Sequence, residues 1–379
     1  MYNAKFLDKM ESNHKGGTLM TLKNKARQLP SSPGVYLMKD SFDAIIYVGK
    51  SKNLKSRVQS YFQTSSKHSK KVEKLVKNIR SFDIIKTDTE FEALLLECQL
   101  IKREQPIFNW MMKNPQVYCY VSVHVTEEYP SIKIVNNTGN NEHQYFGPFP
   151  NRNRIETAVQ GLKEFFQIDC SAQANQQKAC LNYSLGLCMG ICLGGEEVKR
   201  KYHSSLNQII NFLSGNDDSL FDEMEKKMND ASESLDFETA AKYRDYLDTL
   251  HTVHYKEKVL QFAKENKKLL VIEPLDDRFF KLFLIEGDRV LFRKRYEWYL
   301  SNLTILYKQL KAELLPSLKL EIITSSNEIQ KDEIDEAQII YSYVQNAEYC
   351  LYMDEESEEH LDRILMDLLK KAANSKIGV

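Results

Sequence analysis

Residues 33–62 read PGVYLMKDSFDAIIYVGKSKNLKSRVQSYF. A β-forming run from Val35 to Met38 leads through a turn to a second run from Ile45 to Val48. Gly49 ends the second run, and the basic residues that follow recur at helical spacing. The pattern predicts two strands followed by a basic amphipathic helix, which together begin a small α/β unit.

The same residues carry many groups suited to holding and cutting a phosphodiester. Phosphodiester hydrolysis requires an activated water, a group that neutralises the phosphate, and help for the leaving oxygen. A free tyrosine has a pKa of roughly 10, so a tyrosine that accepts a proton near neutral pH needs nearby positive charge. We expect Lys50 and Arg57 to supply such charge beside Tyr47 and to lower its pKa. Arg57 also suits two-point contact with a phosphate.

A metal ligand has to come from another segment. Residues 87–97 are helical in period, with Ala93, Leu94, Leu96 and Leu100 mostly facing inward. Glu97 ends an apolar stretch, where a carboxylate is costly unless it is paired or bound to a metal. One carboxylate with waters and substrate phosphate suits Mg²⁺ or Mn²⁺.

Charge is unevenly distributed along a chain whose net charge is only −1. Residues 50–80 hold ten Lys or Arg and one acid, whereas residues 327–362 hold twelve acids and one Lys. A basic segment of this kind favours contact with nucleic acid, and five lysines are expected to follow a DNA backbone: Lys52, Lys55, Lys70, Lys71 and Lys74. No apolar run approaches the length of a membrane span, so we expect a cytoplasmic protein without membrane contact.

Four of the seven cysteines are clustered as Cys170-x9-Cys180-x7-Cys188-x3-Cys192. Four thiolates within 23 residues suit a tetrahedral metal ion or an iron–sulfur cluster, and the spacing does not choose between them. The remaining three lie in apolar contexts and are expected to be ordinary buried thiols: Cys98, Cys119 and Cys350.

The N-terminal motifs resemble the GIY-YIG nuclease module, and residues 29–40 resemble the start of the UvrC family, a nuclease subunit of bacterial excision repair. Tyr-Val-Gly alone is a common strand end, but seven positions match in order: Tyr36, Tyr47, Lys50, Arg57, Tyr61, Glu97 and Asn109. The resemblance implies that Tyr47 is the general base and that Glu97 is the single metal ligand. It also implies that Tyr36 and Tyr61 are supporting hydroxyls and that Asn109 positions the active site.

The segments 146–149 and 179–194 resemble the cysteine-rich region of the UvrC family. This resemblance implies a four-iron four-sulfur cluster held by the four clustered cysteines, with a structural or redox-sensing role. A zinc site and four unligated core thiols remain as alternatives.

Residues 216–252 show two helical periods separated by the segment Leu235-Asp236-Phe237-Glu238. We expect two short antiparallel helices with an exposed apolar tip that requires a partner. The segment resembles the UVR motif, which implies contact with the helicase subunit UvrB, and indirectly with UvrA. The residues expected at this contact are Leu235, Phe237, Ala240, Ala241 and Arg244. The alternative is a generic helix pair packed on its own domain.

The resemblance covers roughly residues 20–255. Beyond it, three strands are predicted, over residues 269–274, 279–286 and 289–296, followed by acidic helices. Complete UvrC proteins carry an RNase H-like second nuclease and helix-hairpin-helix units in this position. Neither a catalytic Asp-containing strand nor such a unit is evident, so we expect a truncated, degenerate RNase H-like domain without the second activity.

The predicted fold class is α/β multidomain. The expected parts are a polar extension (1–27), a GIY-YIG nuclease domain (28–112), a linker region with the cysteine-rich cluster (113–213), a UVR helical hairpin (214–254) and a divergent α+β C-terminal domain with an acidic tail (255–379).

The predicted function is a single metal-dependent cut 3′ of a lesion in damaged double-stranded DNA bound to UvrB. A non-cutting regulator that competes with full-length UvrC is the alternative, but such a regulator does not need intact catalytic residues. A mobile-element nuclease is a third possibility, and the hairpin argues against it because such enzymes find sites through their own DNA-reading domains.

Overall fold

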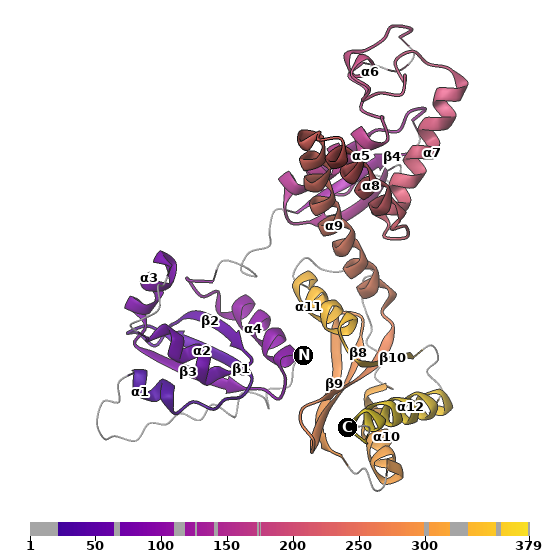
Figure 1. The fold of residues 1–379 in the computed structure, drawn as a ribbon. Coiled ribbons are helices and arrows are strands. Elements are labelled where there is room, and N and C mark those ends of the chain that lie inside the picture. The colour runs from indigo at the N-terminus through magenta and orange to yellow at the C-terminus, as the bar shows by residue number, and fades with distance from the viewer. Residues whose placement is uncertain are drawn as a thin grey trace. The chain divides into compact units, whose positions relative to one another are not determined.

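A computed structural model describes residues 22–63, 69–109, 118–125, 127–139, 143–172, 174, 176–298, 303–318, 333–353 and 358–377. Contacts divide the chain into two compact units (Figure 1). One unit combines residues 1–114 with residues 265–379, and the other contains residues 115–264. Most of the predicted polar extension lies outside the described residues, as do residues 354–357 of the predicted acidic tail.

The nuclease part of the first unit is a three-stranded antiparallel sheet in the order β2-β1-β3, surrounded by helices. Its elements are α1 (Leu22–Arg27), β1 (Gly34–Lys39), β2 (Ile45–Ser51), α2 (Leu54–Tyr61), α3 (Lys70–Asn78), β3 (Ser81–Lys86) and α4 (Glu90–Glu104). Both predicted strands are confirmed as β1 and β2. The single basic helix expected after Gly49 is instead two helices, α2 and α3.

Alternate residues of β1 bury the two faces of this sheet. Tyr36 and Met38 belong to the core that contains α2 and α3 residues. Val35 and Leu37 pack with α4 residues on the other face. The period-2 pattern of the strand therefore places α4 against the face opposite to α2 and α3.

The C-terminal part of the same unit is a four-stranded antiparallel sheet in the order β10-β7-β8-β9. Its elements are β7 (Lys268–Pro274), β8 (Phe279–Glu286), β9 (Arg289–Glu297), α10 (Leu303–Leu318), α11 (Ile334–Gln345), β10 (Tyr349–Met353) and α12 (Glu358–Ile377). The three strands predicted from the sequence are confirmed, and α10 and α12 share a core with one face of the sheet. The RNase H-like character of this domain stays a prediction.

The second unit contains a three-stranded antiparallel sheet in the order β5-β4-β6 together with helices α5 to α9. Its elements are β4 (Cys119–His124), β5 (Ile132–Val135), β6 (His143–Phe149), α5 (Arg152–Phe165), α6 (Leu181–Ser184), α7 (Glu196–Leu213), α8 (Ser219–Glu233) and α9 (Phe237–Glu265). The hairpin was expected to consist of two short helices. Helix α9 instead has 29 residues and continues past residue 254. Its second half stays helical because Val259, Leu260 and Phe262 are buried.

The thiols outside the cluster behave nearly as expected. Cys98 and Cys119 are buried, whereas Cys350 is only partly buried. Among the described residues, no helix combines the length and the apolar character that crossing a membrane requires.

Candidate active site

Tyr36, Tyr47, Tyr61 and Arg57 are brought together on the face of the nuclease sheet that packs against α2 and α3. The hydroxyls of Tyr36 and Tyr61 lie 2.9 Å apart, and Arg57 Nε donates to the Tyr36 hydroxyl at 3.3 Å. The Arg57 guanidinium lies 5.3 Å from the centre of the Tyr61 ring. The Tyr47 ring centre is 6.1 Å from that of Tyr36 and 6.5 Å from that of Tyr61. Four of the seven predicted positions therefore share one site.

Gly49 makes this arrangement possible. The β1–β2 register places Gly49 directly opposite Tyr36. A Cβ atom at position 49 would overlap the Tyr36 ring and its hydroxyl. Glycine is required here because the ring crosses the strand closely.

Asn109 holds strand β2 from its outer edge. Its Oδ1 accepts a hydrogen bond from Val48 N, and its Nδ2 donates to Val48 O, each at 2.9 Å. Phe108 N adds a bond to Ile46 O at 3.0 Å. The buried amide thus continues the sheet by one residue and fixes the strand beside Tyr47.

Glu97 faces the same strand from α4. Its Oε1 accepts a hydrogen bond from Lys50 N at 2.9 Å. Burial raises the pKa of Glu97, although the Lys50 N–H and the charges of Lys50 and Arg57 act in the opposite direction. A carboxylate whose ionised form is destabilised by burial gains from a bound cation, so Glu97 fits the role of a divalent-metal ligand.

Glu90 is a residue of this site that the sequence analysis missed. Its Oε1 lies 2.5 Å from Lys50 Nζ. Glu90 precedes Glu97 by seven residues, two helical turns, and so lies on the same face of α4. The seven-residue spacing between Glu90 and Glu97 is the sequence signal that could have identified Glu90.

The expected depression of the Tyr47 pKa is wrong. Burial raises the pKa of Tyr47 to about 12, with further increases from Tyr61 and Glu97, and only Arg57 is a lowering influence. The Lys50 ammonium is instead paired with Glu90. Desolvation of the phenolate outweighs one half-exposed guanidinium.

The lysines expected to contact DNA lie on α2 and α3, except Lys52, which lies just before α2. Helix α3 begins at the N-cap Ser69 and buries only Leu75 fully. Lys52, Lys70, Lys71 and Lys74 are exposed, whereas Lys55 is half-buried. The structure therefore leaves a lysine-rich surface on the domain that holds the tyrosines.

The four clustered cysteines converge in the second unit. All four Sγ atoms lie within 4.8 Å of one another, and those of Cys170 and Cys180 are 3.8 Å apart. Burial raises the pKa of the Cys170 and Cys192 thiols, whereas at Cys180 the backbone N–H groups of Tyr183 and Ser171 outweigh burial and lower the pKa to about 6. Converging thiols with N–H donors suit a thiolate-ligated metal centre and argue against unligated core thiols.

The separation of the sulfur atoms bears on the choice of metal. Zn–S bonds of about 2.3 Å place the sulfurs of a regular tetrahedron about 3.8 Å apart. In a four-iron cluster each thiolate binds a different iron, so the sulfurs lie farther apart than around a single ion. The 3.8 Å between the Cys170 and Cys180 sulfurs matches a single tetrahedral ion, whereas a four-iron cluster would require the four sulfurs to separate beyond the observed limit of 4.8 Å.

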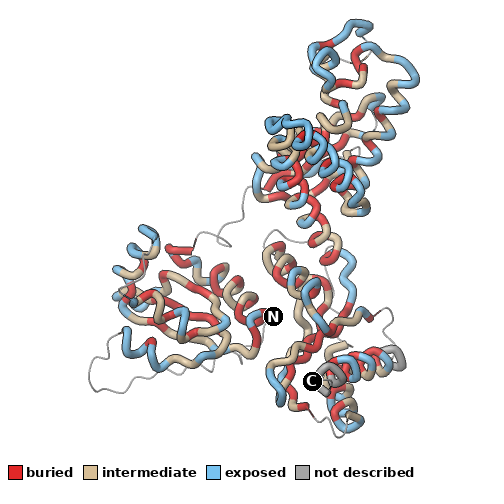
Figure 2. Tube along the Cα trace, in the orientation of Figure 1, coloured by how far each residue is buried: buried red, intermediate tan, exposed pale blue. Residues whose placement is uncertain are grey.

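The tip of the α8–α9 hairpin is exposed and apolar, as predicted. Leu235 is 73% exposed and Phe237 is 64% exposed. Figure 2 colours much of the second unit's helical surface as exposed. Leu235 has a φ of 63°, and Asp236 Oδ1 caps α9 by accepting from Thr239 N at 3.1 Å. Arg244 is exposed, whereas Ala240 and Ala241 are partly buried.

Models of three protein families match the chain in succession. Residues 32–110 match the UvrC-like GIY-YIG domain, residues 118–212 the middle domain of the UvrC/Cho excinuclease, and residues 218–252 the UvrB/uvrC motif. The chain belongs to the UvrC family. Its nuclease domain is therefore a GIY-YIG endonuclease domain, followed by the UvrC middle domain and a UVR motif.

UvrABC system protein C of Alkaliphilus oremlandii is 35% identical over 285 residues, which are 73% of this chain and 46% of the relative. The protein of the same name from Clostridioides difficile is 39% identical over 247 residues, 64% of this chain and 41% of the relative. The chain thus spans less than half the length of these relatives.

Solved structures of the N-terminal endonuclease domain of UvrC from Thermotoga maritima are similar to this chain. The structure with magnesium as its catalytic divalent cation is 31% identical, with a TM-score of 0.22. It covers 24% of this chain and 100% of the solved chain. A variant of the same domain bound to the catalytic divalent cation is 30% identical, also with a TM-score of 0.22, and covers 24% of this chain and 99% of that chain.

Proposed function

We propose that this chain is a UvrC-type DNA endonuclease that makes one metal-dependent cut 3′ of a lesion in UvrB-bound DNA. The observation that carries the proposal is the convergence of Tyr36, Tyr61, Arg57 and Glu97 on Tyr47 in one domain. Its proposed setting is the cytoplasm, where damaged double-stranded DNA and UvrB are accessible to the chain, with UvrA as an indirect partner.

Each residue has a proposed role in the cut. Glu97 holds Mg²⁺ or Mn²⁺, which when bound supplies positive charge to the phosphate and makes a water more acidic. Tyr47 accepts the proton of the attacking water, and Arg57 binds the scissile phosphate. Tyr36 accepts from Arg57 Nε and is hydrogen-bonded to Tyr61, and both rings lie beside that of Tyr47, so the two tyrosines hold Arg57 and Tyr47 in place.

Incision of an end-labelled duplex with one bulky adduct, in the presence of UvrA, UvrB, ATP and Mg²⁺, tests this function. We expect a single cut 3′ of the adduct, which Tyr47→Phe abolishes. Because Tyr47 has a raised pKa and must be deprotonated to act, the rate should rise about tenfold per pH unit between about pH 6.5 and 8.5. Complexes assembled at one pH and diluted into the others separate cutting from assembly.

The same assay distinguishes the competing regulator. A wild-type chain that binds UvrB, makes no cut and inhibits incision by full-length UvrC would replace the nuclease proposal. A rate that stays flat with pH, with Tyr47→Phe still active, would remove Tyr47 from the role of base.

The four cysteines are proposed to hold a structural metal centre. The family resemblance favours a four-iron four-sulfur cluster, whereas the compact sulfur positions favour zinc. Anaerobic purification followed by iron, sulfide and zinc analysis separates these candidates, since a cluster brings about four iron and four sulfide per chain and visible absorbance. Cys188→Ser should lose either metal, whereas Cys350→Ser, a control outside the cluster, should retain it.

A further inference from the structure

Helix α4 is apolar on two faces. Ala93, Leu100 and Ile101 pack on the nuclease sheet. Phe91 lies on the other side, where its ring is stacked on Tyr343 of α11 with 3.7 Å between ring centres and 5° between planes. The edge of Phe283 in β8 completes this contact at 5.3 Å. The C-terminal domain therefore covers the outer face of a nuclease helix.

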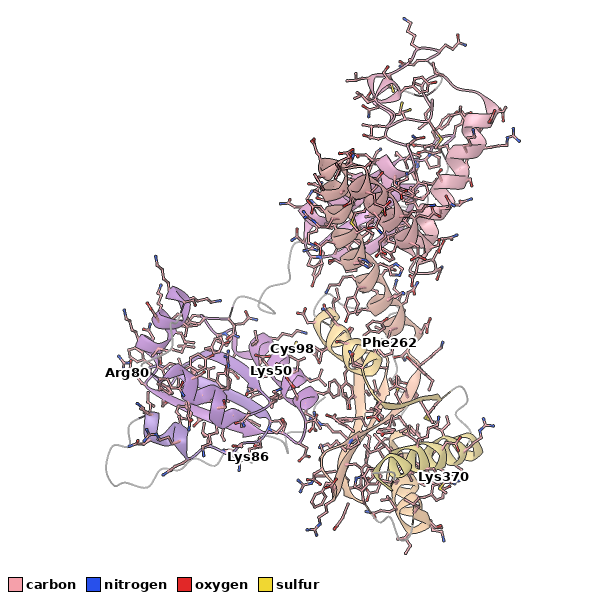
Figure 3. All side chains as sticks on the ribbon, in the orientation of Figure 1. Lys50, Arg80, Lys86, Cys98, Phe262 and Lys370 are labelled. Carbon is pink, nitrogen blue, oxygen red and sulfur yellow. The ribbon has the colours of Figure 1, made fainter. Side chains whose placement is uncertain are left out.

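Cys98 follows the same outer face of α4. Its side chain is fully buried, and its electrostatic neighbours include Asp335 and Glu336 at the start of α11. Figure 3 labels Cys98 on the side of α4 that is turned toward α11. Glu336 also accepts hydrogen bonds from Gln99 at 3.1 Å and from Lys102 at 3.2 Å. The contact thus extends over the whole helix.

A buried lysine of the C-terminal domain binds the first turn of α4. Lys281 Nζ, on β8, lies 2.6 Å from Asp88 Oδ2 and 2.9 Å from Glu92 Oε1. The Lys281 side chain is only 8% exposed and that of Glu92 only 5%. Glu92 Oε2 accepts from Asp88 N at 3.1 Å, while Thr89 Oγ1 accepts from Glu92 N at 3.1 Å. Lys281, at a shorter distance than Arg293 Nε at 3.8 Å, is therefore the nearer cation that fixes the carboxylate closing the N-terminus of the helix.

The same helix leads directly to the active site. Glu90, one residue after the N-cap, pairs with Lys50, and Glu97 binds the backbone of Lys50 two turns later. A helix moves as a rigid element, so a shift of its first turn displaces Glu97 as well. Ligand position matters because partners one step beyond a metal ligand commonly change metal affinity tenfold or more.

We propose that the C-terminal domain is the outer support of the metal-binding helix and that Lys281 is a positioning residue for Glu97. The inference rests on the proposed function only in taking Glu97 as the metal ligand. It gives this domain a role in the first nuclease site that does not depend on any catalytic activity of its own.

The test measures Mn²⁺ binding to the full chain without DNA. The electron paramagnetic resonance signal of free Mn²⁺ reports how much of the metal ion is bound. Lys281→Met should weaken Mn²⁺ binding about tenfold, and Lys281→Arg, which keeps the charge, should restore most of it. Lys294→Met is the matched control, because Lys294 is on the neighbouring strand and pairs with Glu313 within the C-terminal domain. Its affinity should equal that of wild type.

Melting curves separate loss of positioning from loss of folding. If Lys281→Met does not fold, Asp88→Asn removes only one of the two carboxylates from Lys281 and should weaken Mn²⁺ binding about threefold. Wild-type Mn²⁺ affinity in a folded Lys281→Met or Asp88→Asn chain overturns the inference. Wild-type chain that binds Mn²⁺ but makes no cut overturns the proposed function and leaves this inference standing.

Discussion

Glu97→Gln is expected to reduce incision about 1,000-fold, since charge stabilisation by a bound metal contributes several kcal/mol to the transition state. Glutamine has nearly the same shape and keeps an oxygen that can accept from Lys50 N, so the local backbone should not change. Binding to UvrB and DNA should stay at the wild-type level. Single-turnover incision with a binding assay on the same complexes measures both.

Stability gives an independent check on this assignment. Burial raises the pKa of Glu97, so the folded chain favours the protonated carboxyl. The stability that the protonated form contributes is lost as pH rises through the folded-state pKa. The metal-free Glu97→Gln chain should therefore melt at a higher temperature than wild type near neutral pH. Mg²⁺ should raise the melting temperature of wild type and leave that of the variant unchanged.

Glu104→Gln is the matched control for these measurements. Glu104 ends the same helix and pairs with its neighbour Arg103 instead of facing Lys50. We expect incision within about twofold of wild type. Full incision by Glu97→Gln would remove the metal role from Glu97, and equal loss in both variants would point to a general disturbance of α4.

The parts of this fold that are local in sequence were predictable from it. The Val35–Met38 and Ile45–Val48 runs determine a hairpin because their apolar residues alternate and a turn separates them. The three C-terminal strands follow from the same rule. Helix α4 was also visible from its period, although its sequence does not show why it is apolar on two faces.

Long-range pairings were not predictable. Lys281 and Glu92 are far apart in the sequence, and nothing local indicates that they meet. The pKa of Tyr47 was misjudged for a related reason, because burial depends on the whole domain whereas neighbouring charges can be read from spacing. Family resemblance supplied the candidate site residues, and the structure adds that the ammonium of Lys50 pairs with Glu90.

Phe237→Asp is expected to weaken binding to UvrB about 100-fold and to reduce UvrB-dependent incision in proportion, as removal of an aromatic anchor does at many interfaces. Phe237 is the first residue of α9 and projects from the exposed tip beside Leu235. An acid in the first turn of a helix is favourable to the helix dipole, so the hairpin should still fold. Titration of labelled UvrB gives the affinity.

Phe42→Asp is the control for this prediction. Phe42 is 89% exposed, in the turn between β1 and β2, and has the same side chain as Phe237 outside the hairpin. Its substitution should leave UvrB affinity unchanged, which separates a specific anchor from the general effect of removing a surface phenylalanine. If Phe237→Asp binds UvrB as tightly as wild type, the tip is not the contact, and the generic helix pair becomes the better account. If binding falls while Mn²⁺ affinity stays the same, recruitment and the metal site are separable functions of this chain.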